Sequence, residues 1–256
     1  MRHGESCFNR ITGEERRYNP DFCDAHLSDK GIEQAKSRQE DINKLNIEKV
    51  YVSPYNRALE TMFYALETYP SLDKLVVIVH PKIGEIIGCG HDFIFDIKQK
   101  KQKFNMNSKV KVDWSIYDEY VKKSKYDENF LFFENMNFLD EKLKEEKYLK
   151  LKSLYDKGEI QKYKDEVCIF LKEYLKPDIR FESFKHSYER FEEFKKYLLQ
   201  EFTDTINSKD QKVLCICHSA FISIATSPYP FLKDNVKETR DHLFKPKNAE
   251  IISILL

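Results

Sequence analysis

The sequence predicts an α/β protein whose mainly parallel sheet is covered by helices on both faces, a three-layer α/β/α sandwich. Two continuous apolar runs, residues 75–79 and 213–217, have the pattern of strands that are buried on both faces. Segments with helical spacing of apolar residues lie between the predicted strands, and this alternation is typical of a parallel sheet. The 256 residues are enough for one such domain with a large core.

The first half of the chain contains clear start signals for helices. Ser28 is a suitable N-cap for a helix over about 29–43. A short strand is predicted at 49–53. Ser53 followed by Pro54 then predicts an N-cap and first helical residue, with the helix continuing to about residue 68.

The middle of the chain, from about residue 93 to 180, differs in composition. It is rich in Lys, Glu, Tyr and Phe and has almost no Gly or Pro. We expect a helical insertion on one side of the sheet, forming a cap over the site within a single domain of residues 1–256. Its lysine runs, 98–103 and 122–125, are interpreted as a solvated face; the alternative is a positive rim that attracts an anionic substrate. Its Tyr and Phe side chains are interpreted as core, with stacking on a ligand ring as the alternative.

The last part of the chain returns to the alternating pattern. An amphipathic helix is predicted over 187–202 and a last strand over 250–256. In sheets of this kind ligands bind beyond the carboxyl ends of the strands, so we expect the site there.

Composition excludes several classes of function. The chain has 43 Lys and Arg against 43 Asp and Glu, which gives no argument for a nucleic-acid partner or an anionic membrane. No apolar run approaches the roughly 20 residues of a transmembrane helix. The six cysteines have no CxxC spacing and the first residues have no apolar stretch. We therefore expect free thiols and a cytoplasmic location.

Four residues at predicted strand–helix junctions are candidates for chemistry. His3 and His218 lie in loops next to small residues, and Arg57 lies in the first turn of a helix, where its guanidinium could bind an anion. Glu85 lies among apolar residues, a setting that raises the pKa of a carboxyl, as a general acid requires. Taken singly, each of these residue types is more often structural; their common position at junctions favours a site.

The ordered motifs around these residues resemble a known family. Arg2-His3-Gly4 with Asn9, Ser53-Pro54 with Arg57, and Cys217-His218-Ser219 are similar to the signatures of the histidine phosphatase superfamily, the phosphoglycerate-mutase-like proteins. Further segments match in the same order: 27–35, 83–85 and 248–250. The residues 24–27 resemble the plant- and fungal-type branch most closely. The resemblance implies the phosphoglycerate-mutase-like fold.

The resemblance also implies a role for each residue. His3 would be the nucleophile that forms a phosphohistidine, and Glu85 would protonate the leaving oxygen and then activate water. The transferring group would be bound by Arg2, Asn9, Arg57 and a protonated His218. No cofactor and no metal would be needed. The substrate would be a phosphorylated small molecule or a phosphoprotein.

Three functions remain open at this point. Hydrolysis of a phosphomonoester is favoured over a phosphoglycerate mutase, because residues 86–93 do not resemble the lysine- and arginine-bearing segment of the mutases. A non-catalytic binding module on the same fold is a further alternative, since family members place a buried strand before Arg-His-Gly and only Met1 precedes Arg2 here. We expect the fold to hold if another segment fills that place in the sheet. Cys89-Gly90-His91 with Asp92 is interpreted as local structure rather than a metal site.

Overall fold

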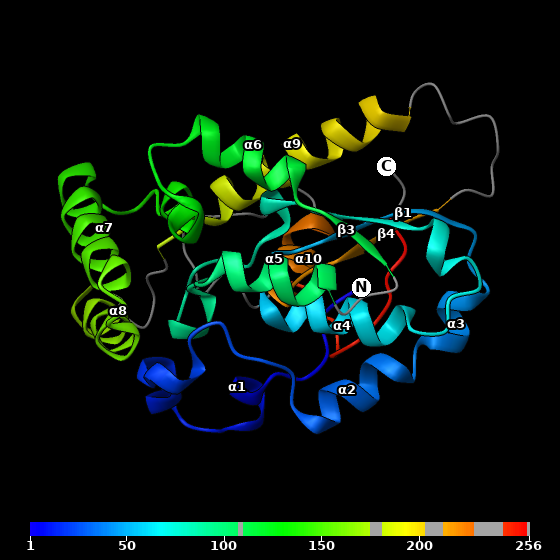
Figure 1. The fold of residues 1–256 in the computed structure, drawn as a ribbon, viewed down its shortest axis with the longest axis horizontal. Helices are drawn as coiled ribbons and strands as arrows, with labels where there is room; N and C mark the ends of the chain where they lie inside the picture. Colours follow the sequence, from blue (N-terminus) through cyan, green and yellow to red (C-terminus); the bar gives the residue numbers. More distant parts are fainter. Residues whose placement is uncertain (107–109, 175–180, 203–211, 228–242, 255–256) are drawn as a thin grey trace.

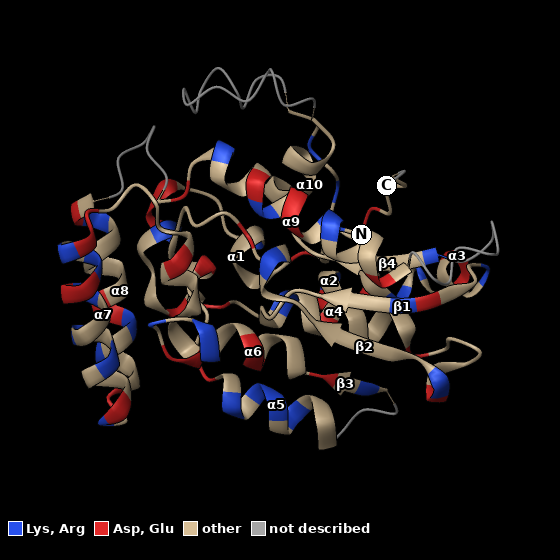
Figure 2. Cartoon of the chain, turned by 90° about the horizontal axis from the view of Figure 1, so that it is seen from above, with Lys and Arg blue, Asp and Glu red and all other residues tan. Residues whose placement is uncertain are grey.

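The computed structural model describes residues 1–106, 110–174, 181–202, 212–227 and 243–254. In this part of the chain four parallel strands form a sheet in the order β3-β2-β1-β4. The strands are β1 (Ile47–Val52), β2 (Val76–Val79), β3 (Lys111–Asp113) and β4 (Lys212–Ile216). Their carboxyl ends point toward the side of the molecule that holds α1 (Cys7–Arg10), as Figure 2 shows for β1 and β2.

Helices cover both faces of this sheet, which confirms the three-layer prediction (Figure 1). Alternate residues of β1 point to opposite faces: Val50 and Val52 belong to one buried cluster, and Tyr51 belongs to another. The first cluster includes side chains of α2, α3 and α4, and the second includes side chains of α9 and α10. These helices are α2 (Asp29–Lys36), α3 (Gln39–Asn43), α4 (Asn56–Leu66), α9 (Phe184–Phe202) and α10 (Ser219–Ala225).

Two predicted helix boundaries were wrong. The helix expected over 29–43 is divided into α2 and α3, because the chain tightens at Ser37, whose hydroxyl donates to the Gln34 carbonyl. Ser28 does cap α2, accepting from the Gly31 amide. Ser53 does not cap α4, which begins at Asn56, because its hydroxyl is bonded to His218 instead.

The segment before the Arg-His-Gly motif lies alongside β4. The Met1 α-amino group donates to the Cys215 carbonyl (2.7 Å) and the Cys217 amide donates to the Met1 carbonyl (3.0 Å). Arg2 and Cys217 form a parallel bridge, and the Arg2 amide donates to Glu250. Residues 1–3 therefore extend the sheet beyond β4.

The predicted last strand is not found in the described residues. Residues 250–254 carry no strand, and 255–256 lie outside the described residues. The chain turns just before this segment: Ala249 has a positive φ of 56° and the Glu250 amide donates to the Lys247 carbonyl (3.1 Å). At this turn the Glu250 carbonyl accepts from the Arg2 amide (3.0 Å), and the Ala249 amide donates to the His3 carbonyl (3.2 Å).

The insertion predicted at 93–180 is not wholly helical. It contains α5 (Ile97–Met106), α6 (Ser115–Lys123), α7 (Glu141–Asp156) and α8 (Ile160–Tyr174), but also β3, which pairs with β2 at the edge of the sheet. The helices α7 and α8 pack together at one end of the molecule (Figure 1). Residues 175–180 lie outside the described residues. The remaining elements are short 3₁₀ helices: Glu14–Tyr18, Pro20–Phe22, Leu72–Lys74, Pro81–Ile83, Gly90–Asp92 and Glu128–Asn135.

The structure shows where the aromatic side chains and the lysines of the insertion lie. Most of its aromatic residues are buried in the same cluster as β1 and β2, including Tyr117, Phe130 and Phe133, so the core interpretation is confirmed. Its lysines form ion pairs rather than an open rim: Lys101 contacts Asp118 and Glu128. Other pairs join Lys103 to Glu60 and Lys125 to Glu141, and Lys100 is buried against Asp24. Among the described residues no helix is both long and apolar enough to span a bilayer.

Two glycines allow the His3 loop to approach α2. A Cβ on Gly31 would clash with the carbonyl oxygen of Glu5, and a Cβ on Gly4 would meet the carbonyl of Gly31. The Ser28 amide also donates to the Glu5 carbonyl (2.9 Å). The loop that carries His3 is therefore held directly against the start of α2.

Gly31→Ala is expected to lower the free energy of unfolding by about 1–3 kcal/mol, because the added methyl group forces the two backbones apart. Urea unfolding at pH 7 measures the change. The matched control is Glu33→Ala, an exposed position on the same helix. Equal stability of the two variants would contradict the close contact.

Candidate active site

His3 is fixed by its backbone and by one ring nitrogen. Its amide donates to the Cys217 carbonyl (2.9 Å) at the end of β4, and its carbonyl accepts from the Ala249 amide (3.2 Å). The ring atom Nδ1 lies 2.6 Å from the Gly4 carbonyl oxygen. Because a carbonyl can only accept, Nδ1 carries the proton and Nε2 keeps its lone pair. A lone pair on Nε2 is what a nucleophilic imidazole needs.

His218 lies beside His3, with the two ring centroids 5.2 Å apart. Its Nε2 atom is 2.7 Å from the Ser53 hydroxyl oxygen, and Tyr55 packs edge-on at 4.8 Å. Its Nδ1 atom is buried and bonds to no described residue. The second imidazole therefore has one anchored nitrogen and one buried nitrogen that bonds to no described residue.

Burial keeps both imidazoles neutral. It lowers the pKa of His3 and of His218 well below the usual 6.5, and the Arg57 charge lowers both further. The neutral state suits His3 as a nucleophile. For His218 burial opposes the protonated form that is expected in contact with a phosphoryl group, and that role stays a prediction.

Arg57 lies in the first turn of α4, as predicted, and is fully buried. Its NH2 group is 3.0 Å from the Asp92 carboxylate, and its NH1 group donates to the His91 carbonyl (2.7 Å). The guanidinium also lies over the Tyr55 ring at 4.5 Å. The sequence did not predict Asp92 as its partner; the only signal was the position of Asp92 shortly after Glu85.

The other three predicted residues line a cavity of about 380 Å³: Arg2, Asn9 and Glu85. The Asn9 side-chain oxygen accepts from Ser6, which leaves its amide nitrogen without a partner among the described residues. The NH1 group of Arg2 donates to the Pro246 carbonyl (2.8 Å), and one Glu85 oxygen accepts from the Ile86 amide (2.9 Å).

His3, Arg57 and His218 are buried and do not line this cavity, but each is next to or in contact with a residue that does. Arg2 precedes His3, Ser219 follows His218, and Asp92 contacts Arg57. All six predicted residues are thus gathered beyond the carboxyl ends of the strands. That they form one functional site, and the role of each, stay predictions.

Sequence reasoning missed several residues of the cavity. Arg17 and Lys245 add positive charge to its wall, and Ile86, Phe184 and Leu243 add apolar surface. Arg17 lies in the charged run 14–17, which gave no sign of facing a cavity. Lys245 follows a long stretch outside the described residues, and no pattern in the sequence connects it with the site.

Cys89, His91 and Asp92 bring three potential metal ligands within 4.8 Å of one another. Their surroundings do not suit a cation. Burial and Asp92 raise the pKa of the Cys89 thiol well above its usual range, which disfavours the thiolate, and the carboxylate of Asp92 already pairs with Arg57. Arg16 and Arg17 add to the positive field at His91. The residues fit local structure better than a metal site.

Comparison with known proteins identifies the amino-terminal part of the chain. Residues 1–90 match the family model described as "Histidine phosphatase superfamily (branch 1)". Over these residues the chain is similar to the histidine phosphatase superfamily. The match includes the superfamily motifs around His3, Arg57 and Glu85. It gives no support to the plant- and fungal-type branch suggested by residues 24–27.

No curated protein matches the chain. Similar solved structures include "Mycobacterial hydrolase 1", with 16% identity, coverage of 97% of this chain and 83% of that chain, and a TM-score of 0.49. A phosphoserine phosphatase from Entamoeba histolytica has 18% identity, coverage of 97% and 84%, and a TM-score of 0.41. A phosphoglycerate mutase from Bacillus anthracis has 17% identity, coverage of 91% and 79%, and a TM-score of 0.43. With scores below 0.5, these structures carry no argument, and the similarity to the superfamily is the match over residues 1–90.

The buried histidines make stability depend on pH. Burial lowers the pKa of His3, His91 and His218 well below 6.5, and that of His80 to about 3. The unfolded chain therefore binds more protons than the folded chain below pH 6.5. The free energy of unfolding should fall from pH 7 to pH 5, by up to about 1.4 kcal/mol per pH unit for each such histidine.

Urea unfolding at pH 7, 6 and 5 measures this slope. His80→Gln should make it shallower, whereas Gln200→Ala, an exposed change that removes no titratable group, should leave it unchanged. A slope that does not change in His80→Gln would show that His80 is protonated in the folded protein.

Proposed function

We propose that the chain hydrolyses a phosphomonoester through a phosphohistidine at His3. One observation carries the proposal: a neutral imidazole, with Nδ1 bonded to Gly4 and Nε2 free to react, lies beside His218 and under the positive field of Arg2 and Arg57. A neutral nucleophile surrounded by fixed cations is suited to attack on a phosphoryl group.

The reaction would proceed in two steps. In the first, Nε2 of His3 bonds to phosphorus as the bond from phosphorus to the leaving oxygen breaks, and Glu85 gives its proton to that oxygen. In the second, Glu85 takes a proton from water, the water oxygen bonds to phosphorus, and the bond to His3 breaks. Inorganic phosphate is released and Glu85 is protonated again.

The charge of the transferring group would be stabilised by side chains alone. Arg2, Arg57 and the amide of Asn9 would donate to its oxygens, and His218 would take up a proton at Nδ1 as the phosphoryl group binds. No cofactor is required for these steps.

The cavity suggests the size of the substrate. About 380 Å³ lined by both cations and apolar side chains would accept a phosphorylated small molecule or a phosphorylated side chain of a protein. The cytoplasmic location and the single-domain organisation stay predictions.

His3→Asn should abolish turnover of phosphomonoesters, because Asn can still donate to the Gly4 carbonyl but has no nucleophilic nitrogen in place of Nε2. We expect a loss of at least about a thousandfold in kcat, as for removal of other covalent nucleophiles. A panel of phosphomonoesters with phosphate release as readout measures it. Acid-labile, base-stable phosphate on the denatured wild-type protein, absent from the variant, identifies the intermediate.

The matched control is His26→Asn, a largely exposed histidine that contacts Glu60 and does not line the cavity. Unchanged turnover in His3→Asn, with the fold retained by circular dichroism, would refute the mechanism.

A phosphoglycerate mutase is the second candidate, because Arg17 and Lys245 could hold a second anionic group in the cavity. A mutase returns the phosphoryl group to the substrate and must keep water away from the phosphohistidine. We expect 2,3-bisphosphoglycerate to be hydrolysed without supporting interconversion of 3- and 2-phosphoglycerate. Interconversion at a rate above phosphate release would favour the mutase instead.

A further inference from the structure

A buried ion pair lies behind the loop that carries Glu85. Arg190 of α9 is 3% exposed. Its Nε atom donates to one oxygen of Glu182 (2.9 Å) and its NH2 group donates to the other (3.1 Å). The Glu182 side chain is itself fully buried. This two-point contact fixes the plane of the guanidinium, because rotation would break one of the two bonds.

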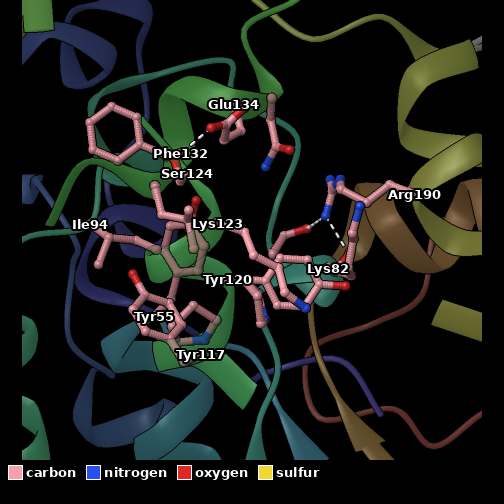
Figure 3. Close-up of a pocket in the computed structure, with 15 residues that line it drawn as sticks. Tyr55, Lys82, Ile94, Tyr117, Tyr120, Lys123, Ser124, Phe132, Glu134 and Arg190 are labelled. Atoms are coloured by element: carbon pink, nitrogen blue, oxygen red, sulfur yellow. Dashed lines mark hydrogen bonds between the residues drawn. The ribbon is translucent and has the colours of Figure 1, made fainter. Parts of the chain in front are cut away.

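The remaining end of the guanidinium holds the backbone just before Glu85. Its NH1 group donates to the carbonyl of Lys82 (2.5 Å) and to that of Gly84 (3.0 Å), as the dashed lines in Figure 3 show. Gly84 directly precedes Glu85. One charged group therefore fixes two backbone carbonyls just before Glu85 in the chain.

Arg190 also contacts the helix that begins after His218. Its guanidinium lies 5.2 Å from the centre of the Phe221 ring, and Phe221 belongs to α10. Arg190 itself does not line the cavity of Arg2, Asn9 and Glu85; it lines a separate one of about 220 Å³, shown in Figure 3. Any effect of Arg190 on the cavity of Arg2, Asn9 and Glu85 must therefore pass through its neighbours.

We propose that Arg190, held by Glu182, is a positioning residue that sets the placement of Glu85 as general acid. The proposal rests on the proposed function. A buried ion pair can instead serve stability alone. The two roles differ in which substrates a variant affects, because only a displaced acid makes the loss depend on the leaving group.

The leaving group can be varied with little change of shape. Phenyl phosphate and 4-nitrophenyl phosphate carry the same ring, but phenolate is much the more basic and needs a proton as it leaves. A misplaced Glu85 should slow phenyl phosphate strongly and 4-nitrophenyl phosphate weakly. Partial unfolding lowers both rates by the same factor.

Arg190→Lys is the main variant, because lysine keeps the charge but cannot bond to Glu182 and to both carbonyls at once. We expect kcat for phenyl phosphate to fall by about tenfold or more and kcat for 4-nitrophenyl phosphate by less than about threefold, with little change in KM. Glu85→Gln should show the same pattern more strongly. If Arg190→Lys does not fold, Glu182→Gln should show it in weaker form.

Two controls lie on the same helix. Leu198→Ala is a buried change away from the Glu85 loop, and we expect equal loss with both substrates. Lys196→Ala is exposed and should change neither rate.

Equal losses with the two substrates in Arg190→Lys, beside a clear difference in Glu85→Gln, would overturn the positioning role and leave the proposed function intact. No difference in Glu85→Gln would overturn both.

Discussion

Arg57 carries a full positive charge with no exposure to water, and this is tolerable only because the Asp92 carboxylate lies 3.0 Å away. Asp92 is held in turn by the amides of Gly88 and Cys89 (3.0 and 3.1 Å). The loop after Glu85 therefore folds against the Arg57 guanidinium of α4. One contact thus fixes both this loop and the candidate phosphate-binding arginine.

The same charge explains the state of the histidines. His3 and His218 are buried near Arg57, and 11% of the His91 side chain is exposed. The Arg57 charge adds to the effect of burial in lowering the pKa of each. A pocket built this way can bind an anion strongly, since its cations are fixed before the anion arrives. The same positive charges disfavour a metal cation, even where potential ligand atoms such as those of Cys89 and Asp92 lie close together.

Much of the fold and the site follows from local sequence. The apolar runs 75–79 and 213–217 correspond to β2 and β4, as predicted. β2 is buried on both faces after its first residue, whereas β4, after its exposed first residue, alternates between half-buried and buried residues. The gathering of His3, Arg57, Glu85 and His218 follows from their places at the ends of parallel strands. The N-cap at Ser53 could not be predicted, because the same hydroxyl had a long-range partner in His218.

Other features depend on contacts between distant segments. Nothing near Arg190 indicates that it would bond to the carbonyls of Lys82 and Gly84, 108 and 106 residues away. The strand β3 was missed because three residues inside a charged, helix-rich region are too short to show a period. The solvated-face interpretation failed for Lys100 because its ammonium group reaches Asp24 and the Pro54 carbonyl.

These contacts of Lys100 join the insertion to the part of the chain that precedes it. Asp24 also accepts from the Asn56 amide (3.0 Å), at the start of the helix that carries Arg57. Deletion of α5 would leave the buried Asp24 carboxylate without its lysine, next to the first turn of α4. The insertion is thus part of the structure that supports the first turn of α4. It could not be replaced by another segment without also changing Asp24.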